Sequence, residues 1–339
     1  MADALACART AVERAEHLAQ RSLDVFAIAL VVVALVFAGV AWSLGDTFFL
    51  RLATEALILA GLAISVDILL GYVGMLSLGQ ALFFGLGAYT SALVLKNLAP
   101  SFWGALIVTL VVATAAGFVA GWIAIRARGV YFALITFGLA QVVSKVIYNT
   151  RELGASDGII GIPVVQADFL LFKIDTGHAA SFFFLVLALT AIVYLLGAYI
   201  MRTPFGRTLA AVRANESRVA FLGFSPHRHK LAAFVIAADI AALFGALYPM
   251  LRGFVSPELM FFATSGNAVI TVIVGGTGTL IGPVFGSVIL TGLKSVVGTF
   301  TEHHLIVIGG LFILSVIFFP KGFVGYLRPP VERWLARRS

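Results

Sequence analysis

The sequence predicts an all-α membrane protein that crosses the bilayer many times. Hydrophobic residues make up 61% of the 339 residues, charged residues only 12%, and the mean hydropathy is +1.05. This composition supplies too little polar surface for a water-soluble domain. Apolar runs of about twenty residues, the length that crosses a bilayer, recur along the whole chain. The protein is therefore expected to be polytopic rather than a soluble domain with one anchor.

About ten transmembrane helices are expected. The first run, 25–42, is not followed by a small-residue cleavage site, so it is predicted to be an uncleaved span and not a signal peptide. The eighth predicted span, 267–276, is short enough to be a partial or broken helix. The predicted spans are 25–42, 51–71, 76–95, 102–124, 129–149, 179–200, 231–251, 267–276, 279–297 and 304–319.

Charge sets the predicted orientation. If the N-terminus is cytoplasmic, 16 of the 23 Lys and Arg residues lie in inner segments and seven in outer ones, as the positive-inside rule requires. Both termini are therefore assigned to the cytoplasm and Asp157 to the periplasm. The predicted parts are an N-terminal segment 1–24, a membrane domain 25–320 with a long inner loop 202–230, and a basic tail 321–339. The single Cys7 excludes a disulfide framework.

Two spans are interrupted by glycine. The stretch "GYVGMLSLGQALFFGLGAYTSALVL" runs from Gly71 to Leu95, and "VGGTGTLIGPVFGSVIL" runs from Val274 to Leu290. One interpretation is close packing of helices through small residues. The other is a backbone break, which membranes tolerate only where it faces protein or water. Paired breaks in two halves of a chain point to a transport path, and both interpretations remain open.

The longest inner loop, "RTPFGRTLAAVRANESRVAFLGFSPHRHK" (202–230), predicts one short amphipathic helix. Thr203 is a plausible N-cap, Pro204 suits the first helical position, and Gly223 supplies a stop. One face is expected to hold Leu209, Val212, Glu216 and Val219. The helix is expected either to rest on anionic headgroups or to dock onto a cytoplasmic partner.

The sequence lacks the common ATP-binding and metalloprotease motifs. No phosphate-cradling G-x-x-x-x-G-K-[ST] motif occurs, so the chain itself is not expected to hydrolyse ATP. H-E-x-x-H does not occur either. Closely spaced histidines such as those at 227, 229, 303 and 304 rarely make a closed metal site without further Cys or carboxylate ligands. We expect no catalytic residue, no metal and no cofactor.

Eight stretches in a fixed order carry a resemblance to a known family. They are "GYVGMLSLGQALFFGLGAY", "RARGVYFALITFGLAQVV", "SDGIIGIP", "FGRTLAAVRANESRVAFLGF", "KLAAFVIAA", "GFVSPEL", "VGGTGTLIGPVFG" and "FFPKGFVG". From about Arg51 to Tyr326 the chain resembles the branched-chain amino acid type (LivM type) of ABC importer permease, of a superfamily that includes sugar and urea permeases.

The resemblance implies a permease subunit of an ABC importer in the bacterial inner membrane. It implies a homologous second permease, two cytoplasmic ATPase subunits that bind the ATP, a periplasmic solute-binding protein and membrane lipid as partners, and no nucleic acid. The solute would be a branched-chain or other amino acid, with urea or an amide as further candidates. The loop helix matches the family's coupling helix, with Arg207, Arg213, Glu216, Ala220 and Gly223 as the residues that couple to the ATPases.

Three residues depart from the family pattern. Asn267 stands where Glu is common, Asp67 where Asn or an apolar residue is common, and Asp239 where a small residue is expected. Intramembrane acids are costly and are functional candidates by default. The predicted substrate path consists of polar and glycine residues at the two breaks, namely Asp67, Ser77, Gln80, Asn267, Gly275 and Gly276.

Two alternatives accompany these predictions. Asp67 is expected either to face the path or to be neutral and hydrogen-bonded to a neighbouring helix. The chain as a whole is expected to be the ABC permease or else an ion-coupled secondary transporter in which Asp67, Lys145 and Asp239 form a relay. A third possibility, a membrane enzyme, has no catalytic constellation in the sequence to support it.

Overall fold

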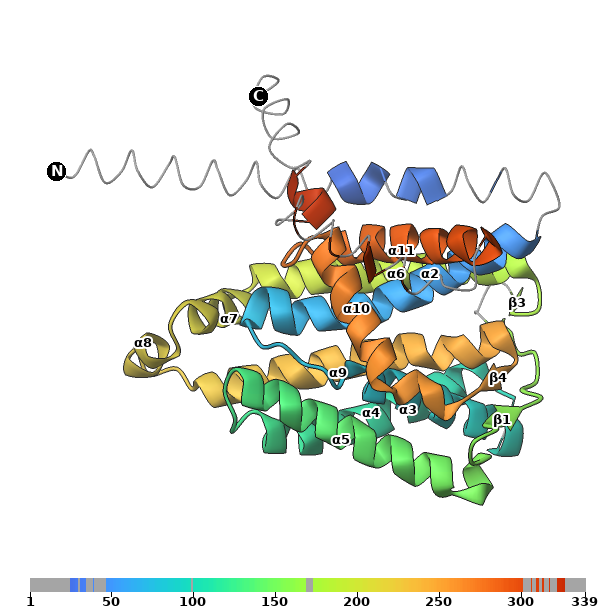
Figure 1. Cartoon of the computed structure of the whole chain (residues 1–339), viewed down its shortest axis with the longest axis horizontal. Coiled ribbons are helices and arrows are strands. Elements are labelled where there is room, and N and C mark those ends of the chain that lie inside the picture. Colours follow the sequence, from blue (N-terminus) through green and yellow to red (C-terminus); the bar gives the residue numbers. More distant parts are fainter. Residues whose placement is uncertain are drawn as a thin grey trace.

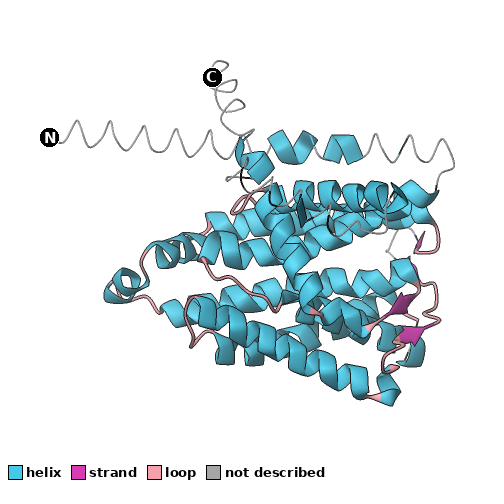
Figure 2. Ribbon diagram, in the orientation of Figure 1, coloured by secondary structure: helices cyan, strands magenta, loops and turns pink. Residues whose placement is uncertain are grey.

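The computed structural model describes residues 25–29, 31–34, 39, 47–98, 100–168, 173–300, 306, 309, 310, 313, 317 and 322–326. The predicted segment 1–24 lies outside this range, as do most of the last predicted span and of the basic tail. The described chain is mainly helical (Figure 2). Seven of its helices are long and apolar enough to cross a membrane, and two shorter apolar helices lie at 25–34 and 262–275.

The first half of the bundle follows the predicted spans, with shifted ends. The elements are α2 (Thr47–Asp67), the π-helix η1 (Ile68–Val73), α3 (Gln80–Leu93), the π-helix η2 (Val94–Leu98), α4 (Phe102–Ala124) and α5 (Val130–Asn149). The third predicted span begins at 80 and not at 76, because Gly74 takes a left-handed conformation and the chain beyond it runs non-helically to Gln80.

The second half contains the two longest helices, α6 (Ala179–Arg202) and α9 (Pro226–Arg252), and two short ones, α7 (Pro204–Ala214) and α8 (Glu216–Phe221). It also contains α10 (Phe262–Gly275) and α11 (Gly282–Phe300). Helix α10 crosses the face of the bundle shown in Figure 1 at a steep angle to the other helices. It starts five residues before the predicted eighth span.

Short strands and 3₁₀ turns gather at one end of the bundle (Figure 1). They are η3 (Arg151–Leu153), β1 (Ile159–Ile160), β2 (Gln166–Asp168), β3 (Lys173–Asp175), β4 (Phe254–Val255) and η4 (Pro257–Met260). Strand β1 pairs antiparallel with β4, and β2 with β3. Helices α7 and α8 project from the opposite end (Figure 1), so the loop that carries Asp157 and the 202–230 loop lie at opposite ends.

Helix α9 is the centre of the bundle, since it packs against α2, α3 and α4. Its contact with α3 is very close: a Cβ on Gly245 would lie 2.0 Å from the Phe84 carbonyl oxygen, and one on Gly87 would lie 2.1 Å from the Ala242 carbonyl oxygen. Such approach between backbones is how membrane helices gain packing energy. Ser91 adds a hydrogen bond across the same contact, from its hydroxyl to the Ala246 carbonyl oxygen at 3.0 Å.

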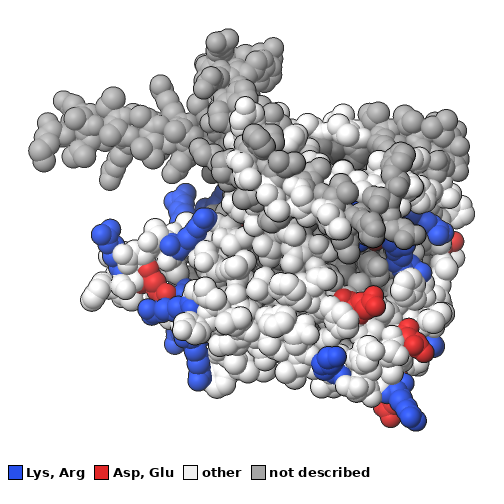
Figure 3. Space-filling model, in the orientation of Figure 1, with Lys and Arg blue, Asp and Glu red and all other residues white. Residues whose placement is uncertain are grey.

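Charged residues lie mainly at the two ends of the bundle. On the face shown in Figure 3, Lys and Arg gather around α7 and α8 and again near the opposite end, with mostly uncharged surface between. Exposed apolar side chains cover α4, α5 and α6 along their length. This is the surface expected of helices that face lipid or another membrane subunit.

Candidate functional site

The two glycine-rich breaks meet each other in space. Helix α2 ends through the π-helix η1, and the second break occupies 276–281 between α10 and α11. A Cβ placed on Gly71 would lie 2.4 Å from the Gly278 backbone nitrogen, so only glycine fits at this contact. Gly276 and Gly278 both have positive φ. The glycines thus serve both interpretations, close packing and backbone breaks, at one junction.

Asp67 joins the two breaks by hydrogen bonds. Its Oδ1 accepts a hydrogen bond from the Gly278 N–H at 2.6 Å, and its Oδ2 accepts one from the Leu280 N–H at 2.9 Å. The side chain is fully buried. Backbone N–H groups released by a break need partners inside a membrane, and this carboxyl group supplies two acceptors. Of the two roles predicted for Asp67, facing the path or hydrogen bonding to a neighbouring helix, the structure shows hydrogen bonding. The partners lie in the 276–281 break and not within a helix.

The loop helix reaches the same junction through Arg213. The Arg213 guanidinium, near the end of α7, donates a hydrogen bond to the Gly71 carbonyl oxygen in η1. A Cβ on Gly74 would lie 2.9 Å from Arg213 Cγ, so the aliphatic stem also packs against the break. Arg213, Gly71, Asp67 and Gly278 therefore form one continuous chain of contacts from the loop to the α10–α11 break.

The predicted single loop helix is wrong, because the chain breaks at Asn215 into α7 and α8. Asn215 is extended (φ −161°, ψ 102°), and its Oδ1 accepts a hydrogen bond from the Arg218 N–H at 3.0 Å, which caps α8. Thr203 precedes α7 with Pro204 at the first position, but its hydroxyl donates back to the Ile200 carbonyl oxygen and does not cap α7. The asparagine before Glu216 was the local signal for this second N-terminus.

The buried face predicted for the loop is present in spite of the break. Leu209, Val212 and Val219 are buried, and Gly223 has the left-handed φ of 85° that ends α8. Glu216 opens α8, where its carboxylate lies 2.7 Å from the Lys230 ammonium and 3.9 Å from the Arg128 guanidinium. These pairs tie α8 to the start of α9 and to the α4–α5 turn.

An exposed apolar tip at the C-terminal end of α8 was missed by the sequence reasoning. Phe221 is 91% exposed, Leu222 75% and Phe224 51%. They follow the exposed Arg218 and Ala220 and surround Gly223. The run "AFLGF" within a basic loop was the available signal. Exposed large apolar side chains rimmed by charge are typical of a protein interaction surface.

The other predicted path residues divide into inward and outward groups. Ser77 and Gln80 are buried, and the Gln80 amide nitrogen and oxygen have no hydrogen-bond partner among the described residues. Asn267 is exposed on α10, whereas Ser265, two residues earlier, is buried and accepts a hydrogen bond from the Ala81 N–H. Within this chain Asn267 and Gln80 therefore lie on different sides of α10.

Gly275 and Gly276 are buried where α10 meets α11. A Cβ on Gly275 would lie 2.0 Å from the Gly282 carbonyl oxygen. They hold the two helices in contact at the edge of the junction formed by Asp67 and Gly278.

The three residues of the alternative relay have separate surroundings. Lys145 lies over the Tyr148 ring, with its ammonium 5.3 Å from the ring centroid. Asp239 accepts a hydrogen bond from the Thr114 hydroxyl at 2.9 Å. Asp67 faces the 276–281 break instead. Each residue thus interacts with a different element, and the arrangement does not favour a proton or ion relay.

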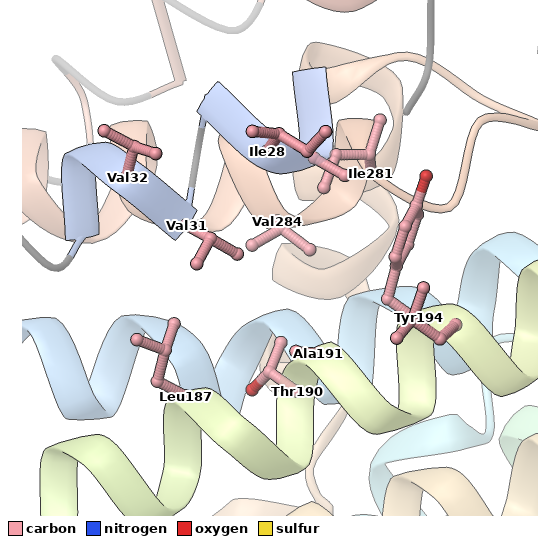
Figure 4. Close-up of a pocket in the computed structure, with 11 residues that line it drawn as sticks. Ile28, Val31, Val32, Leu187, Thr190, Ala191, Tyr194, Ile281 and Val284 are labelled. Atoms are coloured by element: carbon pink, nitrogen blue, oxygen red, sulfur yellow. The ribbon is translucent and has the colours of Figure 1, made fainter. Parts of the chain in front are cut away.

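One apolar pocket is not a candidate solute site. A space of about 240 Å³ lies between the 25–34 segment, α6 and the start of α11 (Figure 4). Its lining is almost wholly hydrocarbon, and the Thr190 hydroxyl donates to its own helix at Val186. Among the residues that the structure describes, no group of three or more His, Cys, Asp or Glu is placed to hold a metal.

Comparison with known proteins gives a consistent result. Residues 48–316 match the family described as "Branched-chain amino acid transport system / permease component". The chain is similar to the high-affinity branched-chain amino acid transport system permease protein LivM of Escherichia coli (strain K12), with 31% identity over 89% of this chain and 76% of the relative. It is 24% identical to LivH of the same strain over 80% and 92%, and 28% identical to the fructose import permease FrcC of Rhizobium meliloti over 54% and 53%. No solved structure matches the chain.

Proposed function

The chain belongs to the family of permease components of branched-chain amino acid transport systems, and from that premise we propose how it works. It is a multi-pass membrane subunit of an ABC importer. We propose that it passes an amino acid with an apolar side chain across the inner membrane. Its partners in this proposal are a LivH-like second permease, two ATPase subunits and a solute-binding protein, and the ATPases hydrolyse the ATP.

The exposed tip of α8 is the single observation that carries the coupling proposal. Phe221 ends the short capped helix α8, and the exposed Leu222 and Phe224 follow it in the chain. Helix α8 lies at one end of the bundle (Figure 1). Burial of three such side chains by a partner is worth several kcal/mol before the costs of association. A helix that only rested on headgroups would not need its own ion pairs from Glu216 to Lys230 and Arg128, which fix its position relative to the bundle.

Movement of α7 and α8 would reach the breaks through Arg213. Closure of the ATPase pair would displace α7, and Arg213 would pull on the Gly71 carbonyl in η1. Because Asp67 lies in the same turn region and holds the Gly278 and Leu280 N–H groups, the 276–281 break would follow. Packed junctions with two arrangements convert small shifts into a switch. The loop and the two breaks would thus move as one unit.

The path itself would lie at the interface with the second permease. Asn267, exposed on α10, would face that interface, and Gln80 would offer its amide from the inner side of α10 once the breaks shift. Asp67 is assigned here to holding the break and not to contacting solute. Both termini would be cytoplasmic, on the side of α7 and α8, in a ten-span topology.

Co-purification tests the proposal. Phe221→Asp with Leu222→Asp should abolish co-purification of the ATPases and ATP-dependent uptake, while the second permease still co-purifies. Val164→Asp makes the same kind of change at a 66% exposed position at the other end of the bundle and should leave the ATPases bound. If the α8 double variant retains ATPases and uptake, α7 and α8 are not the coupling surface.

A further inference from the structure

A charged pocket lies at the end of the bundle opposite to α7 and α8. It has a volume of about 520 Å³ and opens between the start of α2 and the ends of α9 and α11. Binding sites for small molecules usually measure about 300–1,000 Å³ and combine apolar walls with a few polar groups. The polar groups of this pocket come from α2, α9 and α11 and are Arg51, Glu55, Arg252, Thr291, Lys294 and Ser295.

The charges in the pocket do not balance one another. The Arg252 guanidinium donates to Glu55 Oε2 at 2.6 Å, and the Glu55 side chain is only 17% exposed. Arg51 and Lys294 have no ion pair with any described residue, and the second oxygen of Glu55 accepts no hydrogen bond from one. The pocket therefore offers two cations and one carboxylate oxygen that are available to a ligand.

The lining changes character with depth. Arg51, Glu55 and Leu59 follow one another at four-residue spacing on α2, so they share one face of the helix. Because α2 begins at this end of the bundle, the face changes from cationic to acidic to apolar on going inward. Leu52, Leu251 and Phe254 complete the apolar wall.

We propose that this pocket binds a zwitterionic amino acid with an apolar side chain. Arg51 and Lys294 take the carboxylate, the available oxygen of Glu55 takes the ammonium, and the side chain lies along Leu59 and Leu251. A simple anion such as phosphate leaves the Glu55 oxygen unused and close to negative charge. A simple cation meets Arg51 and Lys294. Only a ligand with both charges and an apolar group satisfies the whole lining.

This proposal rests on the proposed function for its place in transport. The pocket lies at the end that a periplasmic binding protein would face, and the two glycine breaks lie farther along α2. A solute released at this end would meet the pocket before it reaches the breaks. The pocket is thus an entry subsite that belongs to the permease and is separate from the Asp67 junction.

Ligand-observed NMR on the purified full chain in phosphatidylcholine nanodiscs tests the site. The ligands are leucine, the carboxylic acid that lacks its amino group, the amine that lacks its carboxylate, and glycine. We expect leucine to bind more tightly than the other three. Arg51→Gln with Lys294→Gln should weaken leucine and the acid by about tenfold, the size of one charged hydrogen bond. Glu55→Gln should weaken leucine but not the acid, a pattern that misfolding cannot produce.

The matched control is Lys145→Gln, which removes an exposed cation on α5 outside the pocket and should leave leucine affinity unchanged. Equal leucine affinity in the wild type and the Arg51 and Lys294 double variant would overturn the proposal. The proposal would also be overturned if the protein bound phosphatidylglycerol but not leucine, because the pocket would then be a lipid headgroup site. ATP-dependent uptake by the whole importer is measured separately. If the double variant takes up solute with unchanged affinity, the subsite alone is refuted. If uptake by the wild type does not depend on ATP, the proposed function alone is refuted.

Discussion

Removal of the Asp67 carboxylate should open the junction between the two breaks. In Asp67→Ala the buried N–H groups of Gly278 and Leu280 lose their acceptors. Each unsatisfied buried group costs about 1–3 kcal/mol, so the expected loss is roughly 2–6 kcal/mol for the pair. Asp67→Asn keeps one acceptor oxygen, so the stability that this variant loses should be about half as large.

Hydrogen exchange of the 276–281 segment measures this loss directly. A loss of about 2 kcal/mol corresponds to roughly thirtyfold faster exchange, and it should be confined to this segment and η1. Thermal unfolding in detergent should show the same order: wild type, then Asp67→Asn, then Asp67→Ala. Uptake should fall in that order with normal expression.

Asp239→Asn is the control for Asp67→Asn. It makes the same chemical change at a partly exposed carboxyl group that accepts a hydrogen bond from the Thr114 hydroxyl. A neutral hydrogen bond between membrane helices is worth about 0.6 kcal/mol, so its effect should be several times smaller. Unchanged exchange at 276–281 in Asp67→Ala, or equal effects of the two Asn variants, would refute the reasoning.

Three further predictions concern packing, the loop and topology. Gly245→Val should prevent α3 from packing on α9, because its Cβ would lie 2.0 Å from a carbonyl oxygen. Size-exclusion chromatography should show the loss of folded protein. Gly138→Ala, where nothing lies within 4 Å of the added Cβ, should be tolerated. Asn215→Ala should destabilise α8 by about 1 kcal/mol and reduce ATPase co-purification, while Asn215→Ser should retain it. A cysteine at Asp157 should be labelled from the periplasm and a reporter after the last residue from the cytoplasm; labelling from one side would contradict the ten-span topology.

The sequence was sufficient for the helical class and for most span positions. Hydropathy located α4, α5 and α6 to within a few residues, because helices long enough to cross a membrane need continuous apolar sequence. The two glycine-rich stretches located both breaks. The ends of α3 and α10 were misplaced, since apolar residues continue through the non-helical segments on either side of them.

The partners of the site residues were beyond such reasoning. Asp67 contacts Gly278 across 211 residues and Arg213 contacts Gly71 across 142, and no local pattern specifies pairs at such separation. Asp67 was marked only by the general cost of an intramembrane acid and by its departure from the family pattern, and neither names its partner. The α8 break differs, because Asn215 and Glu216 form a recognisable helix start that the amphipathic pattern across them concealed.

The contact between the two breaks explains why so much glycine interrupts these spans. Flexibility alone would not require Gly71, which lies within η1 and not in a loop. Its lack of a side chain lets the Gly278 backbone come within reach of Asp67, and the same residue offers its carbonyl to Arg213. A side chain at this position would separate the loop from the α10–α11 break. The glycine therefore makes the breaks interdependent, so neither can change its backbone path without the other.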